Sequence, residues 1–236
     1  MANLTTNEIW SARINTHFPD YRFSWEIYTD LILENVGRCP YWLDIGAGTN
    51  IWIREQPGAE LAVGVDVEKP KGWSMQPDEP YCLAKGESLP FKDESFHFIT
   101  SRYVIEHLKA PHTVLAEIDR VLKPSGVLLL QTTNKTNPLV MAWRLIPFGI
   151  KKRMLKSLYD DIPSGVFRTF YKFNRPSCFK NQIGHLHLEK IIMAEDVLTQ
   201  NRMMFTGSFG MMRLLETLGL QNLMGNIIAI YRKNAD

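Results

Sequence analysis

The sequence predicts an α/β fold in which a mostly parallel sheet is flanked by helices. Three observations carry this prediction. Between residues 41 and 131, short apolar segments of strand length alternate with segments of helix length, an order that gives right-handed crossovers and a parallel sheet. The segment 61–66 is apolar up to its last residue, which is typical of a strand covered on both faces. With 236 residues, the chain is long enough for one such domain with a sizeable core and some additions.

The expected elements follow one another in a simple order. Residues 1–37 are expected to form two helices, the second ending before Gly37, and their aromatic side chains either pack on the sheet or cover a ligand. Residues 38–133 are expected to hold five strands with helices between them. These strands are expected over 41–45, 61–66, 81–84, 96–101 and 127–131, and the clearest helix, with one apolar face, over 111–122.

The alternation of strands and helices stops after Thr133. Residues 134–190 contain no clear strand–helix unit and are expected to form an insertion. Beyond them we expect a helix over 209–218 and a last strand over 226–233. The chain is therefore expected to be a single domain over 1–236, made of an N-terminal helical cap (1–37), a ligand-binding core (38–133), the insertion (134–190) and a C-terminal helix with the last strands (191–236).

Composition and charge restrict the classes of function. The formal net charge of +2 is too small to indicate a nucleic-acid partner. The 3 cysteines are far apart and form no C-x-x-C pair, so neither a zinc site nor a disulfide framework is expected. The first residues lack a basic segment followed by an apolar stretch, and no apolar run reaches the roughly 18 residues of a membrane-spanning helix. We expect a reduced, cytoplasmic protein.

The most informative segment is 43–49, Leu-Asp-Ile-Gly-Ala-Gly-Thr, at the end of the first expected strand. Its two glycines allow a tight turn, at which the backbone passes close to a bound nucleoside. A dinucleotide-binding turn has a third glycine where this chain has Ile51, and a pyrophosphate would be repelled by Asp44. A ligand that carries an ammonium and a sulfonium would be attracted by Asp44, so the turn indicates S-adenosylmethionine (SAM).

Asp66 closes the second expected strand, eighteen residues after Gly48. An acid at this place can accept hydrogen bonds from both hydroxyls of a ribose. Because nicotinamide-dependent enzymes and SAM-binding proteins share this feature, Asp66 supports a nucleoside site without separating the two classes.

Three further segments follow the turn in a characteristic order. They are residues 87–96 (Glu-Ser-Leu-Pro-Phe-Lys-Asp-Glu-Ser-Phe), 103–108 (Tyr-Val-Ile-Glu-His-Leu) and 116–126 (Ala-Glu-Ile-Asp-Arg-Val-Leu-Lys-Pro-Ser-Gly). Together with the turn, they resemble the class I SAM-dependent methyltransferases, in particular the group called type 11, over about residues 40–133. The resemblance implies a Rossmann-like, seven-stranded sheet whose last strand is antiparallel. It also implies methyl transfer from SAM, with S-adenosylhomocysteine (SAH) as the product.

The resemblance implies a role for each matching residue of the turn and the second strand. Asp44 and the turn Gly46-Ala47-Gly48 would hold the methionine part of SAM. Asp66 would bind the ribose, and Val67 would lie against the adenine.

The resemblance also implies roles for two later pairs of residues. Gly86 and Glu87 would line the polar edge of the adenine, and Ser101 and Arg102 would lie near the sulfonium and the methionine end. One position departs from the family. Two residues before Glu87 the family usually has an acid that accepts a hydrogen bond from the adenine amino group, and this chain has Lys85, whose ammonium cannot accept one.

A hydroxyl acceptor would need a general base, and histidine is the usual base near neutral pH. His185 and His187 come late in the insertion, and their spacing would put both on one face of a strand. They are the candidate catalytic residues, with a structural role as the alternative. The pair Glu106-His107 is expected to be structural, as in the resembled family. No acid is clearly spaced as a third ligand near His185 and His187, so we expect no metal site.

The insertion is expected to select the acceptor, by analogy with the fold. Residues 139–150 are strongly apolar and three basic residues follow at once, a pattern that favours either a packed lid or a peripheral contact with an anionic membrane through 139–156. Residues 166–179 interleave aromatic and basic side chains, which suits an aromatic acceptor pocket; the low net charge argues against nucleic acid.

We therefore expect a SAM-dependent methyltransferase that acts on a small-molecule, saccharide or lipid-linked acceptor, at oxygen rather than at carbon or nitrogen. Two alternatives stay open. One is a non-catalytic protein of the same fold that serves as a binding partner, and the other is a nicotinamide-dependent oxidoreductase, against which Ile51 and Asp44 argue. The sequence does not determine the oligomeric state.

Overall fold

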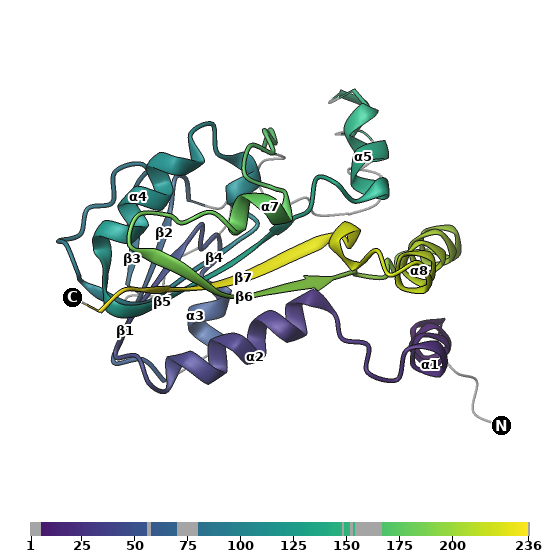
Figure 1. Cartoon of the computed structure of the whole chain (residues 1–236), viewed down its shortest axis with the longest axis horizontal. Helices are drawn as coiled ribbons and strands as arrows, with labels where there is room; N and C mark the ends of the chain where they lie inside the picture. The colour runs from purple at the N-terminus through teal and green to yellow at the C-terminus, as the bar shows by residue number, and fades with distance from the viewer. Residues whose placement is uncertain are drawn as a thin grey trace.

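A seven-stranded sheet with the order β3-β2-β1-β4-β5-β7-β6 forms the centre of the computed structural model (Figure 1). The structure describes residues 6–55, 58–69, 80–147, 149–151, 153 and 167–235. The strands are β1 (Tyr41–Ile45), β2 (Leu61–Asp66), β3 (Tyr81–Leu83), β4 (Phe96–Arg102), β5 (Leu122–Thr133), β6 (Leu186–Ala194) and β7 (Asn226–Lys233).

The five strands from β3 to β5 pair in parallel, whereas β7 is antiparallel to both β5 and β6. The predicted Rossmann-like sheet with an antiparallel last strand is thereby confirmed. Because the parallel strands all end at one edge, the loops after β1, β2 and β4 meet there.

Helices cover both faces of the sheet (Figure 1). They are α1 (Thr6–His17), α2 (Ser24–Val36), α3 (Ile51–Glu55), α4 (Pro111–Val121), α5 (Pro138–Leu145), α7 (Pro176–Phe179) and α8 (Arg202–Thr217), with 3-10 helices η1 (Ile105–His107) and η2 (Gln221–Leu223). The helices α4 and α7 lie on one face of the sheet, and α2 and α3 lie on the other.

Apolar side chains of the strands form one buried cluster on each face of the sheet. On the α4 side, Leu115 and Ile118 pack with sheet residues such as Ile99. On the α2 side, Tyr28 and Ile32 lie in a cluster with Trp42, Phe98 and three further strand residues. Tyr28 of α2 therefore belongs to the sheet's core, whereas Trp25 of the same helix is exposed, and the burial of this cluster holds α2 against the sheet.

The helices α1 and α8 lie side by side at one end of the molecule (Figure 1). The rings of Trp10 and Phe205 stack with their centroids 5.1 Å apart, and Phe205 stacks on Phe209 at 5.4 Å. Ile14 and Met212 complete this third cluster. The predicted N-terminal helices are thus both present, and each packs on a different part of the protein.

Three elements differ in extent from the sequence prediction. Strand β5 begins at Leu122 rather than at 127, because Leu122 already pairs with Phe96 ahead of an irregularity in the ladder. Helix α8 begins at Arg202 rather than at 209, because the Asn201 side chain caps it by accepting from the Met204 N–H. Strand β6 begins at Leu186, so the sheet starts before the boundary expected at residue 190.

Among the helices of the described ranges, none combines the length and the apolar character that crossing a bilayer requires.

Candidate functional site

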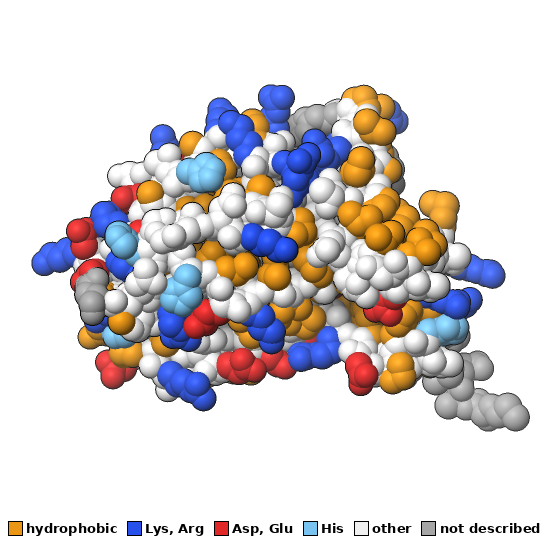
Figure 2. All heavy atoms as spheres, in the orientation of Figure 1, with side chains coloured by type: hydrophobic (Ala, Val, Ile, Leu, Met, Phe, Trp, Pro, Cys, Tyr) orange, Lys and Arg blue, Asp and Glu red, His pale blue; other side chains and the backbone are white. Residues whose placement is uncertain are grey.

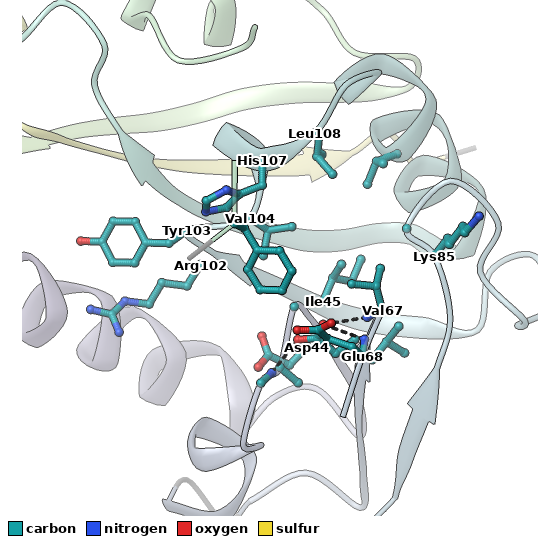
Figure 3. Close-up of a pocket in the computed structure, with 18 of the residues that line it drawn as sticks. Asp44, Ile45, Val67, Glu68, Lys85, Arg102, Tyr103, Val104, His107 and Leu108 are labelled. Atoms are coloured by element: carbon teal, nitrogen blue, oxygen red, sulfur yellow. Dashed lines mark hydrogen bonds between the residues drawn. The ribbon is translucent and has the colours of Figure 1, made fainter. Parts of the chain in front are cut away.

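A cavity of about 890 Å³ lies at the carboxyl ends of β1, β2 and β4 (Figure 3). Strand β1 stands between β2 and β4, so the order of the strands reverses here, and ligands of open α/β sheets bind at such a point. The cavity is lined by residues from five segments, which are 44–52, 65–68, 84–87, 102–109 with Val114, and 167–170.

The glycine turn forms one wall of the cavity and is attached to the end of β2. Gly46 (φ 76°) and Gly48 (φ 52°) both have left-handed backbone conformations, which glycine adopts without strain. The N–H groups of Gly46 and Ala47 donate to the Val65 carbonyl at 2.8 and 3.0 Å. A Cβ on Gly46 would collide with Cγ2 of Val104. The turn is therefore a fixed backbone cradle in which Gly46 cannot carry a side chain.

Asp44 places a buried carboxyl group against this turn; the residue is only 3% exposed. The Thr100 hydroxyl donates to Asp44 Oδ1 at 2.6 Å and accepts from the Trp42 indole N–H at 2.8 Å. Burial raises the pKa of Asp44 to about 7, against the opposing effect of the Thr100 hydrogen bond. Within the described residues no lysine or arginine forms an ion pair with Asp44. A buried carboxyl group of this kind suits a ligand that brings its own positive charge.

Arg102, whose charge acts on this carboxyl, forms its own contacts with other residues. Arg102 Nε donates to Gln131 Oε1 at 2.9 Å. The guanidinium carbon lies 4.9 Å from the ring centroids of both Trp52 and Tyr103. Arg102 lines the cavity, and its charge opposes the rise in the pKa of Asp44, while its guanidinium packs on aromatic faces.

Asp66 lies at the end of β2 and also lines the cavity. Its Oδ2 accepts from the Gly48 N–H at 2.9 Å and its Oδ1 from the Val67 N–H at 2.6 Å. Oδ1 also receives the Glu68 N–H at 3.5 Å, a distance at which a hydrogen bond is weak. Each carboxylate oxygen has two lone pairs, so Oδ2 can still accept from a ribose hydroxyl, and Oδ1 can do so in place of this long contact. The same contacts orient the carboxylate before any ligand binds.

The opposite wall is formed by the loop after β3. Gly86 and Glu87 line the cavity together with Val67, which is 58% exposed, and Glu68, which the sequence did not single out. Lys85 also lies at this wall, and its ammonium points away from the centre of the cavity (Figure 3).

Ser101 does not reach the cavity, although it was predicted to lie beside the sulfonium. It is 5% exposed within β4, paired with Ile45 and Leu130. Successive side chains of a strand point to opposite faces, so Ser101 and Arg102 cannot both face the same side. The structure brings only Arg102 to the cavity.

The two candidate catalytic histidines lie at the other end of the sheet. His187 is in register with Arg232, which pairs with Val127 near the amino end of β5. His185 precedes β6, and its Nδ1 lies 2.9 Å from Asp119 Oδ2. Neither histidine lines the cavity, and no set of three His, Cys, Asp or Glu side chains in the described ranges is placed to hold a metal ion.

Aromatic and basic side chains line the part of the cavity formed by the loop after β4 and the segment 167–170. We call it the acceptor end; it is lined by Tyr103, His107, Lys109, Phe167 and Phe170. His107 was expected to be structural, yet its ring lines this end. No cavity-lining residue comes from the described part of the N-terminal helices.

Comparison with known proteins agrees with this geometry. Residues 43–130 match the family model of a methyltransferase domain. Over 121 residues the chain is 30% identical to the ubiquinone/menaquinone biosynthesis C-methyltransferase UbiE of Neisseria meningitidis, with 51% of this chain and 48% of that protein covered. The chain thus spans about half the length of the curated relatives it matches.

Two solved structures show how widely the fold occurs. The N-methyltransferase NodS of Bradyrhizobium japonicum, in complex with SAH, superposes with a TM-score of 0.50 at 13% identity, covering 94% of this chain and 90% of NodS. The [4+2]-cyclase SpnF superposes with a TM-score of 0.52 at 16% identity, covering 92% of this chain and 85% of SpnF. At these identities the likeness concerns the fold alone. The match of residues 43–130 and the topology of this sheet identify a class I methyltransferase domain in this chain, for which SAM is the cofactor.

Proposed function

We propose that this protein transfers a methyl group from SAM to a small hydrophobic acceptor. The observation that carries the proposal is the buried Asp44 carboxyl beside the glycine turn, which forms no ion pair with any described lysine or arginine, at a cavity that continues into an acceptor end. SAM supplies a methyl group on a positively charged sulfur, and the chain's own residues bind it, orient it and exclude water. Asp44 and the turn would hold its methionine part, Asp66 its ribose, and Val67, Gly86 and Glu87 its adenine.

We propose oxygen as the atom that is methylated. The relative UbiE is named a C-methyltransferase and NodS an N-methyltransferase, so likeness does not decide the atom. A histidine at the acceptor end favours oxygen, because a hydroxyl must lose a proton as it is methylated. A hydrophobic or lipid-linked acceptor is favoured over a saccharide, because Phe167 and Phe170 line this end.

Calorimetric titration tests the proposal. We expect SAM and SAH to bind and NADH to produce no heat of binding, because Asp44 attracts a cation and repels a pyrophosphate. Tight binding of NADH with no response to SAM or SAH would instead support an oxidoreductase. Binding of SAH without turnover on any acceptor would support a non-catalytic binding protein or, as the shared fold of SpnF suggests, a different reaction.

The same titration has a distinctive pH dependence. With its pKa at about 7, Asp44 is about one-tenth ionised at pH 6 and about nine-tenths ionised at pH 8, so SAM affinity should rise roughly tenfold over this interval. The stability of the unliganded protein should change with pH in the opposite direction. Because the pKa of Asp44 is higher in the folded state than in the unfolded state (~3.9), its contribution to the free energy of unfolding is fully present below pH ~3.9 and is lost as the pH rises towards 7. Asp44→Asn should bind SAM weakly and flatten both profiles; an unchanged pH profile in this variant would contradict the assignment.

We also propose that α5 brings the protein to an anionic membrane surface, which would present a lipid-linked acceptor. Seven of its eight residues are apolar and none is buried; Leu145 is 86% and Met141 54% exposed. Hydrophobic side chains gather over α5 beside several lysine and arginine side chains (Figure 2). Of the range 139–156 proposed for this contact, residues 148, 152 and 154–156 lie outside the described residues.

Co-sedimentation with vesicles tests the membrane contact. The protein is expected to sediment with vesicles that contain phosphatidylserine, and high salt or the substitution Leu145→Ser should release it, because both the apolar and the charge attraction contribute. Leu33→Ser is the matched control, since Leu33 is 53% exposed but lies on α2, across the sheet. Equal binding of both variants, or no binding at low salt, would reject the contact.

A further inference from the structure

The acceptor end is built from two segments far apart in the sequence. One is the loop after β4 with η1, and the other is the segment 167–170. The N–H groups of Phe170 and Tyr171 both donate to the Glu106 carbonyl oxygen, at 2.7 and 3.1 Å. These backbone contacts fix the wall that carries Phe167 and Phe170 against the loop that carries His107.

The residue that receives these hydrogen bonds is itself fixed to the sheet. Glu106 is 3% exposed, and its carboxylate accepts from the hydroxyls of Thr132 at 2.7 Å and Thr133 at 3.3 Å, at the end of β5. The position of His107 is therefore set by the sheet through its neighbour Glu106.

The ring of His107 has one nitrogen occupied and one available. Its Nδ1 lies 3.2 Å from the backbone carbonyl oxygen of Arg168. A carbonyl oxygen can only accept, so Nδ1 carries the proton of the neutral ring and Nε2 is the acceptor. In the described ranges no hydrogen bond to Nε2 is formed, and the ring projects from η1 into the cavity (Figure 3).

Two phenylalanines and a lysine line the same end of the cavity as His107. The Phe167 ring meets the His107 ring edge-on, with centroids 5.9 Å apart. The Lys109 ammonium lies 5.7 Å from the centroid of Phe170, and Lys109 lines the cavity. Such an end suits a flat aromatic ring that develops negative charge, because the two phenylalanines offer apolar contact and Lys109 offers the opposite charge.

We propose that the acceptor is a phenol bound against Phe167 and Phe170, and that His107 Nε2 is the general base that takes its proton. The inference rests on the proposed function and names the substrate class and the base for it. The phenol O–H proton goes to Nε2 while the oxygen forms a bond to the methyl carbon, and the carbon–sulfur bond breaks with its electron pair left on sulfur. The products are an aryl methyl ether, SAH and a protonated imidazole that returns its proton to solvent.

The test compares phenols of different acidity on the native protein and on His107→Ala and His107→Gln. With phenol itself, turnover in either variant should fall by roughly 10²–10⁴-fold, while SAH affinity stays within about twofold. With the more acidic 4-nitrophenol, which ionises without help near neutral pH, the loss should be far smaller. Added imidazole should restore part of the turnover of His107→Ala on phenol.

A second readout needs no turnover. In the SAH complex, 4-nitrophenol should bind to the native protein and to His107→Gln, but the visible band of the bound nitrophenolate should be weaker in the variant. His112→Ala is the matched control, because His112 lies on α4, packs edge-on against Phe173, and does not line the cavity. His185→Ala and His187→Ala should likewise leave turnover unchanged.

The outcomes separate this inference from the proposed function. If SAM and SAH do not bind, the proposed function fails. If they bind but no phenol binds to the SAH complex, or if phenol and 4-nitrophenol lose turnover equally, or if His185→Ala or His187→Ala is the more damaging variant, the assignment of His107 and of a phenol is overturned while SAM binding stands.

Discussion

Replacing Asp66 by alanine is expected to weaken the binding of SAM and SAH by well over tenfold. Two hydrogen bonds from ribose hydroxyls to a carboxylate would be lost, each worth about 1.5–3 kcal/mol. The variant also loses the acceptor for the N–H groups of Gly48 and Val67, so the turn is less well ordered before binding. Isothermal titration calorimetry with SAH measures the change.

A control separates the ribose contact from the ordering of the turn. An SAH analogue that lacks both ribose hydroxyls should bind the native protein much more weakly than SAH does. To Asp66→Ala it should bind as well as SAH does, because the partner of the hydroxyls is already gone. Glu68→Ala removes a neighbouring cavity-lining charge and should have little effect. Unchanged SAH affinity in Asp66→Ala would show that Asp66 does not bind the ribose.

The substitution Gly46→Ala should damage both stability and SAM binding. A side chain at this left-handed position costs roughly 1–2 kcal/mol, and forcing its Cβ against Val104 adds about 1–3 kcal/mol of overpacking. Urea denaturation measures the free energy of unfolding, and titration with SAH measures the affinity that depends on the glycine turn. We expect a clear loss of stability and at least a tenfold loss of affinity, because the turn must shift to make room.

The substitution Val104→Ala serves as the partner in a double-mutant cycle. It removes the methyl group that the new Cβ would strike. The loss in the free energy of unfolding of the double variant should therefore be smaller, by more than about 1 kcal/mol, than the sum of the losses of the two single variants. Gly48→Ala adds a comparison, because its Cβ would meet no atom within 4 Å and only the backbone strain applies. Strict additivity of Gly46→Ala and Val104→Ala would show that the collision does not limit the turn.

The sequence predicted the cavity best at the strand ends, where the residue type follows from the local backbone or the local charge. Glycines at 46 and 48 and acids at 44 and 66 are local features of strand ends, and the structure brings all four to one cavity. The parallel core was predictable for the same reason, since its strands alternate with helices along the chain.

The acceptor end was predictable only in part. The segment 166–179 was expected to suit an aromatic acceptor pocket, and its Phe167 and Phe170 do line the cavity, but their meeting with His107 depends on pairing between distant segments. His185 and His187 were attractive for their spacing, but β6 runs antiparallel to β7, so its beginning lies at the end of the sheet away from the cavity. The pair Glu106-His107 was expected to be structural, as in the resembled family. The hydrogen bond from the Phe170 N–H to the Glu106 carbonyl, which no local pattern gives, brings this turn and the segment 167–170 together at the cavity. Ser101 was expected at the cavity together with its neighbour Arg102, but adjacent side chains of a strand point to opposite faces.

The wall that carries Phe167 and Phe170 is joined to Glu106 by main-chain groups alone. These two hydrogen bonds therefore do not depend on which side chains stand at 167 and 170, although the Phe167 ring adds an edge-on contact with His107. During evolution, residues at 167 and 170 can change the shape and polarity of the acceptor end without detaching the wall, whereas Asp44, Thr100 and Trp42 are tied together through their side chains and cannot drift separately. A lineage built on this scaffold can acquire new substrates while its cofactor preference stays fixed.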